Sequence, residues 1–295
     1  MGKKKTSIGT WAYIWGGYSE DPVPFETVVK RISELGFDGI EFGAFDPHFT
    51  ENTPEKRKEI KKLLLDYNLG LSGVAAPFSS PATSDKEKYL DEVKGYIEMC
   101  SDMGIPKLRV DTVDPPTIIP GGMDYETCFS KVAEVWNKSA ELCEKAGIKF
   151  IWEFEPGFLF NKPSEVVRMT YKVDHPNFSI LFDSCHAHMC GVLASRQLGE
   201  KEVLPGGVVQ FAHMLTGKIG HIHLIDSDDT LHDNDTSTHA PLGTGKLNFE
   251  EIITAIKEAG YNDDWWPIDL CFWPKALDVT ADNKKYLDML IEKYA

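Results

Sequence analysis

The sequence predicts an α/β protein, a single (β/α)₈ barrel that spans residues 1–295. Eight short apolar runs alternate with eight longer amphipathic segments along the chain. This alternation is typical of a parallel sheet whose strands are connected by helices. The chain length of 295 residues also fits, since a barrel of this kind needs about 250 residues. A short glycine phrase that recurs between helix and strand is the third observation.

The apolar runs are short enough to be strands buried in a barrel. They fall at residues 7–11, 39–42, 71–75, 107–111, 149–153, 179–183, 219–224 and 266–270. The amphipathic segments predict helices, because their apolar residues recur at a helical spacing, as Val28, Ile32 and Leu35 do. These helices are expected at residues 24–35, 54–67, 86–103, 125–146, 163–171, 208–215, 250–258 and 281–293.

Five glycines are expected to end helices, because glycine readily adopts the positive φ of a helix C-terminus. They are Gly36, Gly70, Gly104, Gly147 and Gly260, and all but Gly70 stand in the same phrase, a glycine followed by one apolar residue and soon by a strand. An open doubly wound sheet is the alternative fold, but no glycine-rich fingerprint follows the first strand. The longest irregular stretch is expected at residues 227–245, before the seventh helix.

The charge, the apolar runs and the cysteines of the sequence argue against several classes of binding partner. The formal net charge of -15 and the pI near 5.0 argue against nucleic acid, because an acidic surface repels phosphate. No run approaches the roughly 18 apolar residues of a membrane span, so no membrane partner is expected. The six cysteines form no C-x-x-C pair, and we expect them to be reduced and mostly buried in a cytoplasmic protein. The sequence leaves the oligomeric state open, a homo-oligomer included.

The last four strands of the predicted barrel each end in a carboxylate or an imidazole. These side chains are Glu153, Asp183, His223 and Asp269. Active residues of barrels sit at the carboxyl ends of strands, and such groups are costly to bury alone. A shared cation removes that cost. One histidine with three carboxylates suits one divalent metal ion, Mn²⁺ or Mg²⁺ first, with Co²⁺ and Zn²⁺ as alternatives.

Two of the four residues have a competing residue of the same type two positions away on the same strand. Glu153 and Glu155 have the same parity on their strand, so geometry does not choose between them, and Glu153 is preferred because it lies nearer the strand end. Glu155 is then a substrate contact or a turn cap. Of His221 and His223 we expect only one, His223, to face the barrel mouth, while the other packs in the protein or faces solvent.

Further residues are candidates for binding a substrate. His186 lies three residues beyond Asp183 and suits a contact beside the metal, whereas His188 is expected to be structural. Arg109 on the fourth strand is the clearest cation near the mouth, and His239 and Lys246 lie in or beside the long loop. Aromatic rings near the mouth suit the C–H faces of a sugar, with ordinary loop packing as the alternative. They are Trp11, Tyr13, Trp15, Phe154, Phe158, Phe272 and Trp273.

Three motifs resemble the xylose isomerase-like TIM barrel family of sugar isomerases and epimerases. Residues 182–186 resemble its D-x-x-H segment, residues 220–226 its H-x-H strand, and residues 241–247 its P-x-G-x-G segment. The resemblance implies the metal ligands Glu153, Asp183, His223 and Asp269, the last standing where the family usually has Glu. It also implies that Glu153 and Asp269 form the acid/base pair, although Asp269 is one methylene shorter than the usual Glu and has less reach toward a substrate proton.

The resemblance implies an enzyme that removes a proton next to a carbonyl of a small sugar or keto-sugar, through an enediolate stabilised by the metal. We expect an unphosphorylated substrate, because a phosphate site usually shows more basic residues or a glycine-rich helix start. A lyase or dehydratase acting on a keto-sugar or keto-glycoside is the main alternative. A non-catalytic sugar-binding barrel is less favoured. An endonuclease of the apurinic-site type would need a basic groove, which the net charge opposes.

Overall fold

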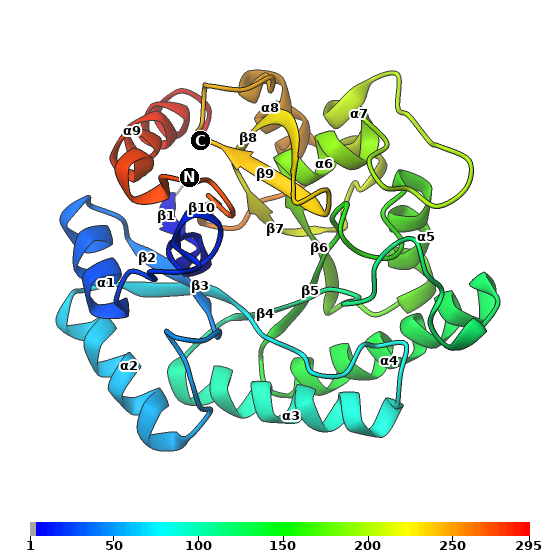
Figure 1. Cartoon of the computed structure of the whole chain (residues 1–295), viewed down its shortest axis with the longest axis horizontal. Coiled ribbons are helices and arrows are strands. Elements are labelled where there is room, and N and C mark those ends of the chain that lie inside the picture. Colours follow the sequence, from blue (N-terminus) through cyan, green and yellow to red (C-terminus); the bar gives the residue numbers. More distant parts are fainter. Residues whose placement is uncertain (1–3) are drawn as a thin grey trace.

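In the computed structural model, which describes residues 4–295, eight parallel strands form a barrel wall and the helices lie around it (Figure 1). β2 to β7 form one continuous parallel sheet, and β10 pairs with β1. The wall strands are β1 (Lys5–Ile8), β2 (Gly39–Gly43), β3 (Gly70–Ala75), β4 (Lys107–Val110), β5 (Lys149–Glu153), β6 (Phe178–Asp183), β7 (Ile219–His223) and β10 (Trp265–Ile268).

Single parallel bridges join the two sheets and close the barrel. Gly9 bridges to Glu41, which links β1 to β2, and Leu224 bridges to Ile268, which links β7 to β10. Backbone hydrogen bonds from Leu224 N to Pro267 O (2.9 Å) and from Gly9 N to Ile268 O (3.2 Å) lie at these seams. The predicted (β/α)₈ TIM barrel is therefore confirmed.

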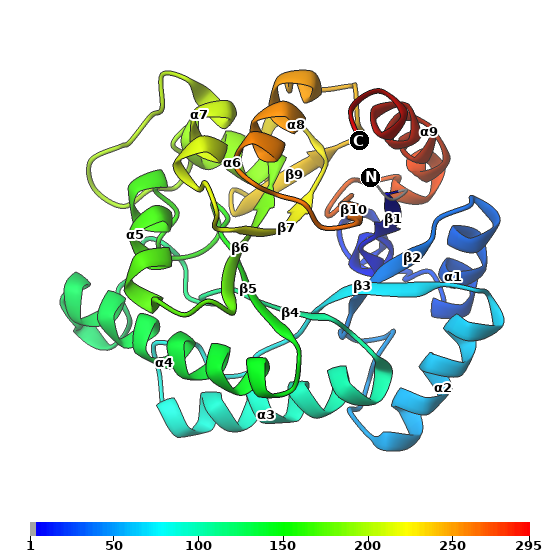
Figure 2. The same cartoon turned by 180° about the vertical axis from the view of Figure 1, so that it is seen from behind.

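The helices form an outer layer, which is also visible from behind in Figure 2. Thr53, Asp85 and Asp124 start α2, α3 and α4, because each side chain accepts the backbone N–H three residues later. The helices are α1 (Phe25–Glu34), α2 (Pro54–Asp66), α3 (Lys86–Met103), α4 (Tyr125–Lys145), α5 (Pro163–Val173), α6 (Ser184–Gly191), α7 (Gly207–Met214), α8 (Phe249–Glu258) and α9 (Ala276–Tyr294), with the 3₁₀ turns η1 (Thr10–Tyr13), η2 (Gly16–Tyr18) and η3 (Pro120–Gly122).

The expected glycine turns are present with one exception. Gly36, Gly104, Gly147 and Gly260 have φ of 77°, 78°, 72° and 95°. Gly70 was expected to end a helix in the same way, and this is wrong because Gly70 is the first residue of β3. Asn68, with φ of 55°, takes the left-handed conformation after α2 instead, and asparagine is one of the residues that tolerates it.

The irregular stretch expected at residues 227–245 is wrong in its first part. An antiparallel hairpin forms there from β8 (Asp226–His232) and β9 (Thr236–Ala240). Its turn places Asp233 and Asn234 at φ of 49° and 56°, which Asp and Asn tolerate better than other side chains. Helix α6 is the other unpredicted element, and Asp183 caps it by accepting the backbone N–H of His186 at 2.7 Å.

The structure also tests the predictions about membrane spans and cysteines. Within residues 4–295, no helix combines the length and the apolar character that crossing a bilayer requires. All six cysteines are free and buried, as expected. The apolar residues form one large core, in which Trp136, Trp152 and Phe150 are fully buried.

Candidate metal centre

The four side chains predicted to hold a metal come together at the carboxyl ends of the strands. Glu153 ends β5, Asp183 ends β6, His223 ends β7, and Asp269 follows β10. All four are buried, and one potential ligand atom from each lies within 4.8 Å of every other. His223 Nδ1 lies 3.0 Å from Glu153 Oε1, 3.7 Å from Asp183 Oδ2 and 3.6 Å from Asp269 Oδ2. We call these four residues the metal group.

Three of these four atoms are buried without a hydrogen-bond partner. They are Glu153 Oε1, Asp183 Oδ2 and His223 Nδ1, judged among the residues that the structure describes. Burying polar atoms without partners is unfavourable, and carboxylates so close together repel one another. A divalent cation relieves both effects at once, and three carboxylates with one imidazole are ligands that such ions accept. The metal group is therefore able to bind one divalent ion.

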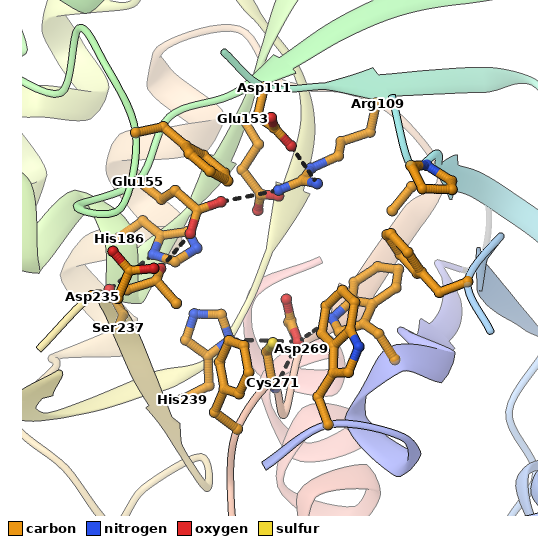
Figure 3. Close-up of a pocket in the computed structure, with 18 of the residues that line it drawn as sticks. Arg109, Asp111, Glu153, Glu155, His186, Asp235, Ser237, His239, Asp269 and Cys271 are labelled. Atoms are coloured by element: carbon orange, nitrogen blue, oxygen red, sulfur yellow. Dashed lines mark hydrogen bonds and ion pairs between the residues drawn. The ribbon is translucent and has the colours of Figure 1, made fainter. Parts of the chain in front are cut away.

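Arg109 stabilises the charged form of Glu153. Its Nε donates to Glu153 Oε2 at 2.6 Å, and its two terminal nitrogens donate to Asp111 (3.0 Å) and Glu155 (3.1 Å) (Figure 3). Burial alone would raise the pKa of Glu153, but Arg109 and His223 outweigh burial and lower that pKa to about 2. Arg109 lines the cavity as predicted, yet each of its nitrogens already bonds a carboxylate.

Glu155 occupies a different environment from Glu153. Its Oε1 accepts from Arg109, and its Oε2 accepts from the hydroxyl of Thr236 in β9. Burial raises the pKa of Glu155 to about 8, and the negative charge of Glu153 adds to the rise although Arg109 opposes it. The structure thus separates two glutamates that strand parity could not. Glu153 belongs to the metal group and Glu155 lines the cavity beside it.

Asp269 is fixed by the chain around it. Its Oδ1 accepts from the indole Nε1 of Trp11 at 2.9 Å and from the backbone N of Cys271 at 2.8 Å. Its Oδ2 is the atom that faces His223 Nδ1. Because the short side chain is fixed from two directions, one of its oxygens is directed into the metal group.

Two histidines lie next to the metal group. His186 Nδ1 is 2.8 Å from Ser237 Oγ, and its ring lies 4.7 Å from that of His239. His239 Nδ1 approaches Asp269 Oδ1 at 3.4 Å, and neither ring nitrogen has a hydrogen-bond partner among the described residues. His188 instead bonds Asp229 on the hairpin, away from the cavity. Lys246 is exposed and does not line the cavity.

A cavity of about 270 Å³ opens above the metal group. Trp15 forms part of its wall, with its ring stacked on Phe272 at 5.8 Å and tilted against Phe45 at 4.6 Å. Of the rings predicted at the mouth, Trp11, Trp15, Phe158 and Phe272 line the cavity, together with the unpredicted Phe45 and Phe78. Three predicted rings pack elsewhere, namely Tyr13, Phe154 and Trp273.

His221 and Glu41 were not predicted as part of this arrangement. We expected only His223 to face the barrel mouth and His221 to pack in the protein or face solvent. His221 is indeed packed and fully buried, but the expectation that the two alternate in direction is wrong, because residues two apart on a strand share a face. His221 and His223 both point into the barrel, and the Nε2 atoms of both lie near Glu41 Oε2, at 2.9 and 3.2 Å. A carboxylate inside a predicted buried strand was the signal that could have identified Glu41.

The family model described as "Xylose isomerase-like TIM barrel" matches residues 29–288. The chain belongs to this family. Membership agrees with the closed barrel and with the motifs at the ends of β6 and β7, on which the resemblance was based.

Other members of the xylose isomerase-like family are similar over most of their length. A fructoselysine 3-epimerase of Shigella flexneri is 24% identical over 81% of this chain and 83% of its own. The structure of a D-tagatose 3-epimerase-like protein superposes with a TM-score of 0.70 at 22% identity, covering 99% of this chain and 100% of that one. A structure of IolI protein described as having a bound zinc atom gives 0.72 at 17% identity, covering 99% of each chain.

Proposed function

We propose that the protein is a divalent-metal-dependent sugar isomerase or epimerase that transfers a proton at a carbon next to a carbonyl. The observation that carries this proposal is the convergence of Glu153 Oε1, Asp183 Oδ2 and His223 Nδ1, buried and without hydrogen-bond partners among the described residues. Asp269 Oδ2 completes the set. The similarity to a fructoselysine 3-epimerase and to a D-tagatose 3-epimerase-like protein favours the same class of reaction.

The metal group would hold one divalent ion, with Mn²⁺ the first choice. When bound, such an ion acts as a Lewis acid that draws electron density from a carbonyl and so makes the neighbouring C–H more acidic. Glu153 is our proposed base, because Arg109 keeps it ionised and it faces the cavity. Asp269 is proposed as a ligand and as the second acid/base candidate. His186, His239 and Glu155 line the same cavity and are proposed to bind substrate hydroxyls.

The cavity favours an uncharged sugar or keto-sugar. Arg109 is the only lysine or arginine among the cavity-lining residues that the structure describes, and its nitrogens already bond carboxylates. A phosphorylated or carboxylated substrate would therefore find no free lysine or arginine and would meet Asp111 and Asp269. The aromatic wall around Trp15 offers flat apolar surfaces on which the C–H face of a sugar packs.

A lyase acting on a keto-sugar or keto-glycoside is the second candidate, and Asp269 is the observation that favours it. Trp11 and the backbone of Cys271 fix one oxygen, and the other faces the metal group. Asp269 also has one methylene fewer than the glutamate usual at this position in the family, so it has less reach toward a substrate proton than Glu153 has. If it only binds the metal, a single base, Glu153, remains for proton removal, which suffices for elimination of a leaving group.

One experiment separates these reactions. The metal-loaded enzyme is incubated in deuterated water with unphosphorylated ketohexoses and 3-keto-glycosides, and the products are followed by NMR. Epimerisation predicts deuterium at the inverted carbon, whereas isomerisation predicts an aldose, with deuterium next to its carbonyl when the proton exchanges with solvent. Elimination predicts an unsaturated product and a released group. An absence of deuterium uptake and of product with every sugar, under conditions where metal is bound, would refute the proposal.

A further inference from the structure

A second layer of polar side chains lies inside the barrel, beneath the metal group. Glu41 of β2 and His221 of β7 are completely buried there. Glu41 Oε2 accepts from His221 Nε2 at 2.9 Å and from His223 Nε2 at 3.2 Å. His223 therefore connects the two layers, with its Nε2 on Glu41 and its Nδ1 in the metal group.

The neighbouring strand packs against this carboxylate. Gly73 of β3 is the register partner of Glu41, and a Cβ at Gly73 would lie 3.4 Å from Glu41 Oε1. Barrel interiors are usually filled with Val, Ile and Leu, and a buried carboxylate is unfavourable unless it is paired. The two imidazoles provide the pairing. Apolar residues would fill this layer without the free-energy cost of burying a charge, which indicates that Glu41 has a role beyond packing.

The hydrogen bond to Glu41 determines which nitrogen of His223 is free. A neutral imidazole carries its proton on one nitrogen and a lone pair on the other. Glu41 Oε2 lies within hydrogen-bond distance of two imidazole nitrogens, and a carboxylate oxygen only accepts, so both imidazoles donate to it. His223 must then carry its proton on Nε2, which leaves the lone pair of Nδ1 directed at the metal group.

We propose that Glu41 is a positioning residue that fixes the tautomer and the ring orientation of His223 for metal binding. His221 donates to the same oxygen and holds the carboxylate in place. The inference rests on the metal site of the proposed function. It adds a residue from the opposite side of the barrel, 182 positions away in sequence from the histidine it orients.

The test measures metal affinity directly. Metal-free wild type, Glu41→Gln and Glu41→Asp are titrated with Co²⁺ against a chelator of known affinity, and the visible absorption of bound Co²⁺ is recorded. Glu41→Gln keeps an oxygen that both imidazoles can reach but loses the negative charge, so both hydrogen bonds weaken and we expect the affinity to fall by about 10–100-fold. Glu41→Asp keeps the charge and should recover part of this loss.

Ser7→Ala is the matched control, because the buried Ser7 Oγ donates to Ser72 Oγ at 2.8 Å and, among the described residues, has no hydrogen bond to Glu41 or to either histidine. It should leave the affinity and the spectrum unchanged. Thermal unfolding of the metal-free variants identifies any that does not fold. If Glu41→Gln does not fold, ¹⁵N NMR of the zinc-loaded wild type still tests the inference, because the inference requires a proton on Nε2 of His223.

Several results would overturn the inference, and each differs from a failure of the proposed function. A wild-type His223 protonated on Nδ1 would do so, as would a folded Glu41→Gln with wild-type affinity and spectrum. The wild type could also bind two Co²⁺ ions per chain, with Glu41→Gln losing one of them. That result would show that Glu41, His221 and His223 bind an ion of their own, and that Glu41 does not act by positioning His223. A wild type that binds no metal at all would instead remove the proposed function itself.

Discussion

The cavity has two unlike sides. One side consists of carboxylates and imidazoles that end or follow β5, β6 and β10 or lie on the β8–β9 hairpin, among them Glu153, His186 and His239, and these are buried (Figure 3). The other side consists mainly of aromatic rings from the segments after β1, β2 and β3, among them Trp15, Phe45 and Phe78. The difference indicates a division of roles, in which the polar side performs the reaction and the aromatic side determines which molecule fits. Substitutions on the two sides should therefore have different kinetic effects.

Glu153→Gln should have the largest effect, because it removes the proposed base from the polar side. General-base catalysis typically contributes about 10²–10⁴-fold, so kcat should fall by about that factor while the overall fold persists. Deuterium uptake from solvent into substrate is the measurement, with circular dichroism as the check on folding. Uptake at the wild-type rate would remove Glu153 from the role of base.

Removal of the metal should destabilise the whole polar side. The buried carboxylates of the metal group repel one another, and burial raises the pKa of Asp183 to about 7. A ligand present at 100 times its Kd adds about 2.7 kcal/mol to the free energy of unfolding. We therefore expect added Mn²⁺ to raise the melting temperature of the metal-free protein, and Asp183→Asn to lose this shift. An equal shift in both proteins would place the stabilising ion elsewhere.

Trp15→Ala tests the aromatic side. It removes apolar contact that substrate and transition state share, so KM should rise by about 10-fold, equivalent to about 1.4 kcal/mol, while kcat changes little. Trp273→Ala is the matched control, because Trp273 packs against the core and does not line the cavity. A large fall in kcat for Trp15→Ala, with KM unchanged, would contradict the separation of the two sides.

Apart from the control Trp273→Ala, Asp269→Glu should have the smallest effect of these substitutions. Glutamate is the usual residue at this position in the family, and it keeps the charge with one more methylene. If Asp269 serves only as a ligand, metal affinity and much of the activity should survive. Metal content and steady-state rates are measured together, and an inactive variant with its metal bound would assign Asp269 a role in proton transfer.

Most of the barrel could be predicted because its elements have strong periodic signals. The ranges expected for β5 and α3 coincide with the observed ones, Lys149–Glu153 and Lys86–Met103. Helix α6 was missed because it is short and buried on nearly every side, so it shows no amphipathic pattern. The β8–β9 hairpin was missed because its residues are mainly polar, and its turn depends on Asp233 and Asn234 rather than on glycine.

The candidate site could be predicted only where function follows directly from position in a strand. Glu153, Asp183, His223 and Asp269 lie at or just after strand ends, and the barrel brings such ends together. The partnership of Glu41 with His223 depends instead on which side chains meet inside the closed barrel, between strands far apart in sequence. Arg109 was recognised as a cation near the mouth, but its three carboxylate partners become apparent only in the folded chain.

The most direct test of the central claim is the metal stoichiometry of the purified protein after reconstitution. Elemental analysis should find about one divalent ion per chain, as expected of a single four-ligand site, and the ion should be lost in the double variant Asp183→Asn, His223→Asn. Wild type without a stoichiometric ion, or a double variant that retains it, would contradict the assignment of Glu153, Asp183, His223 and Asp269 as one metal centre.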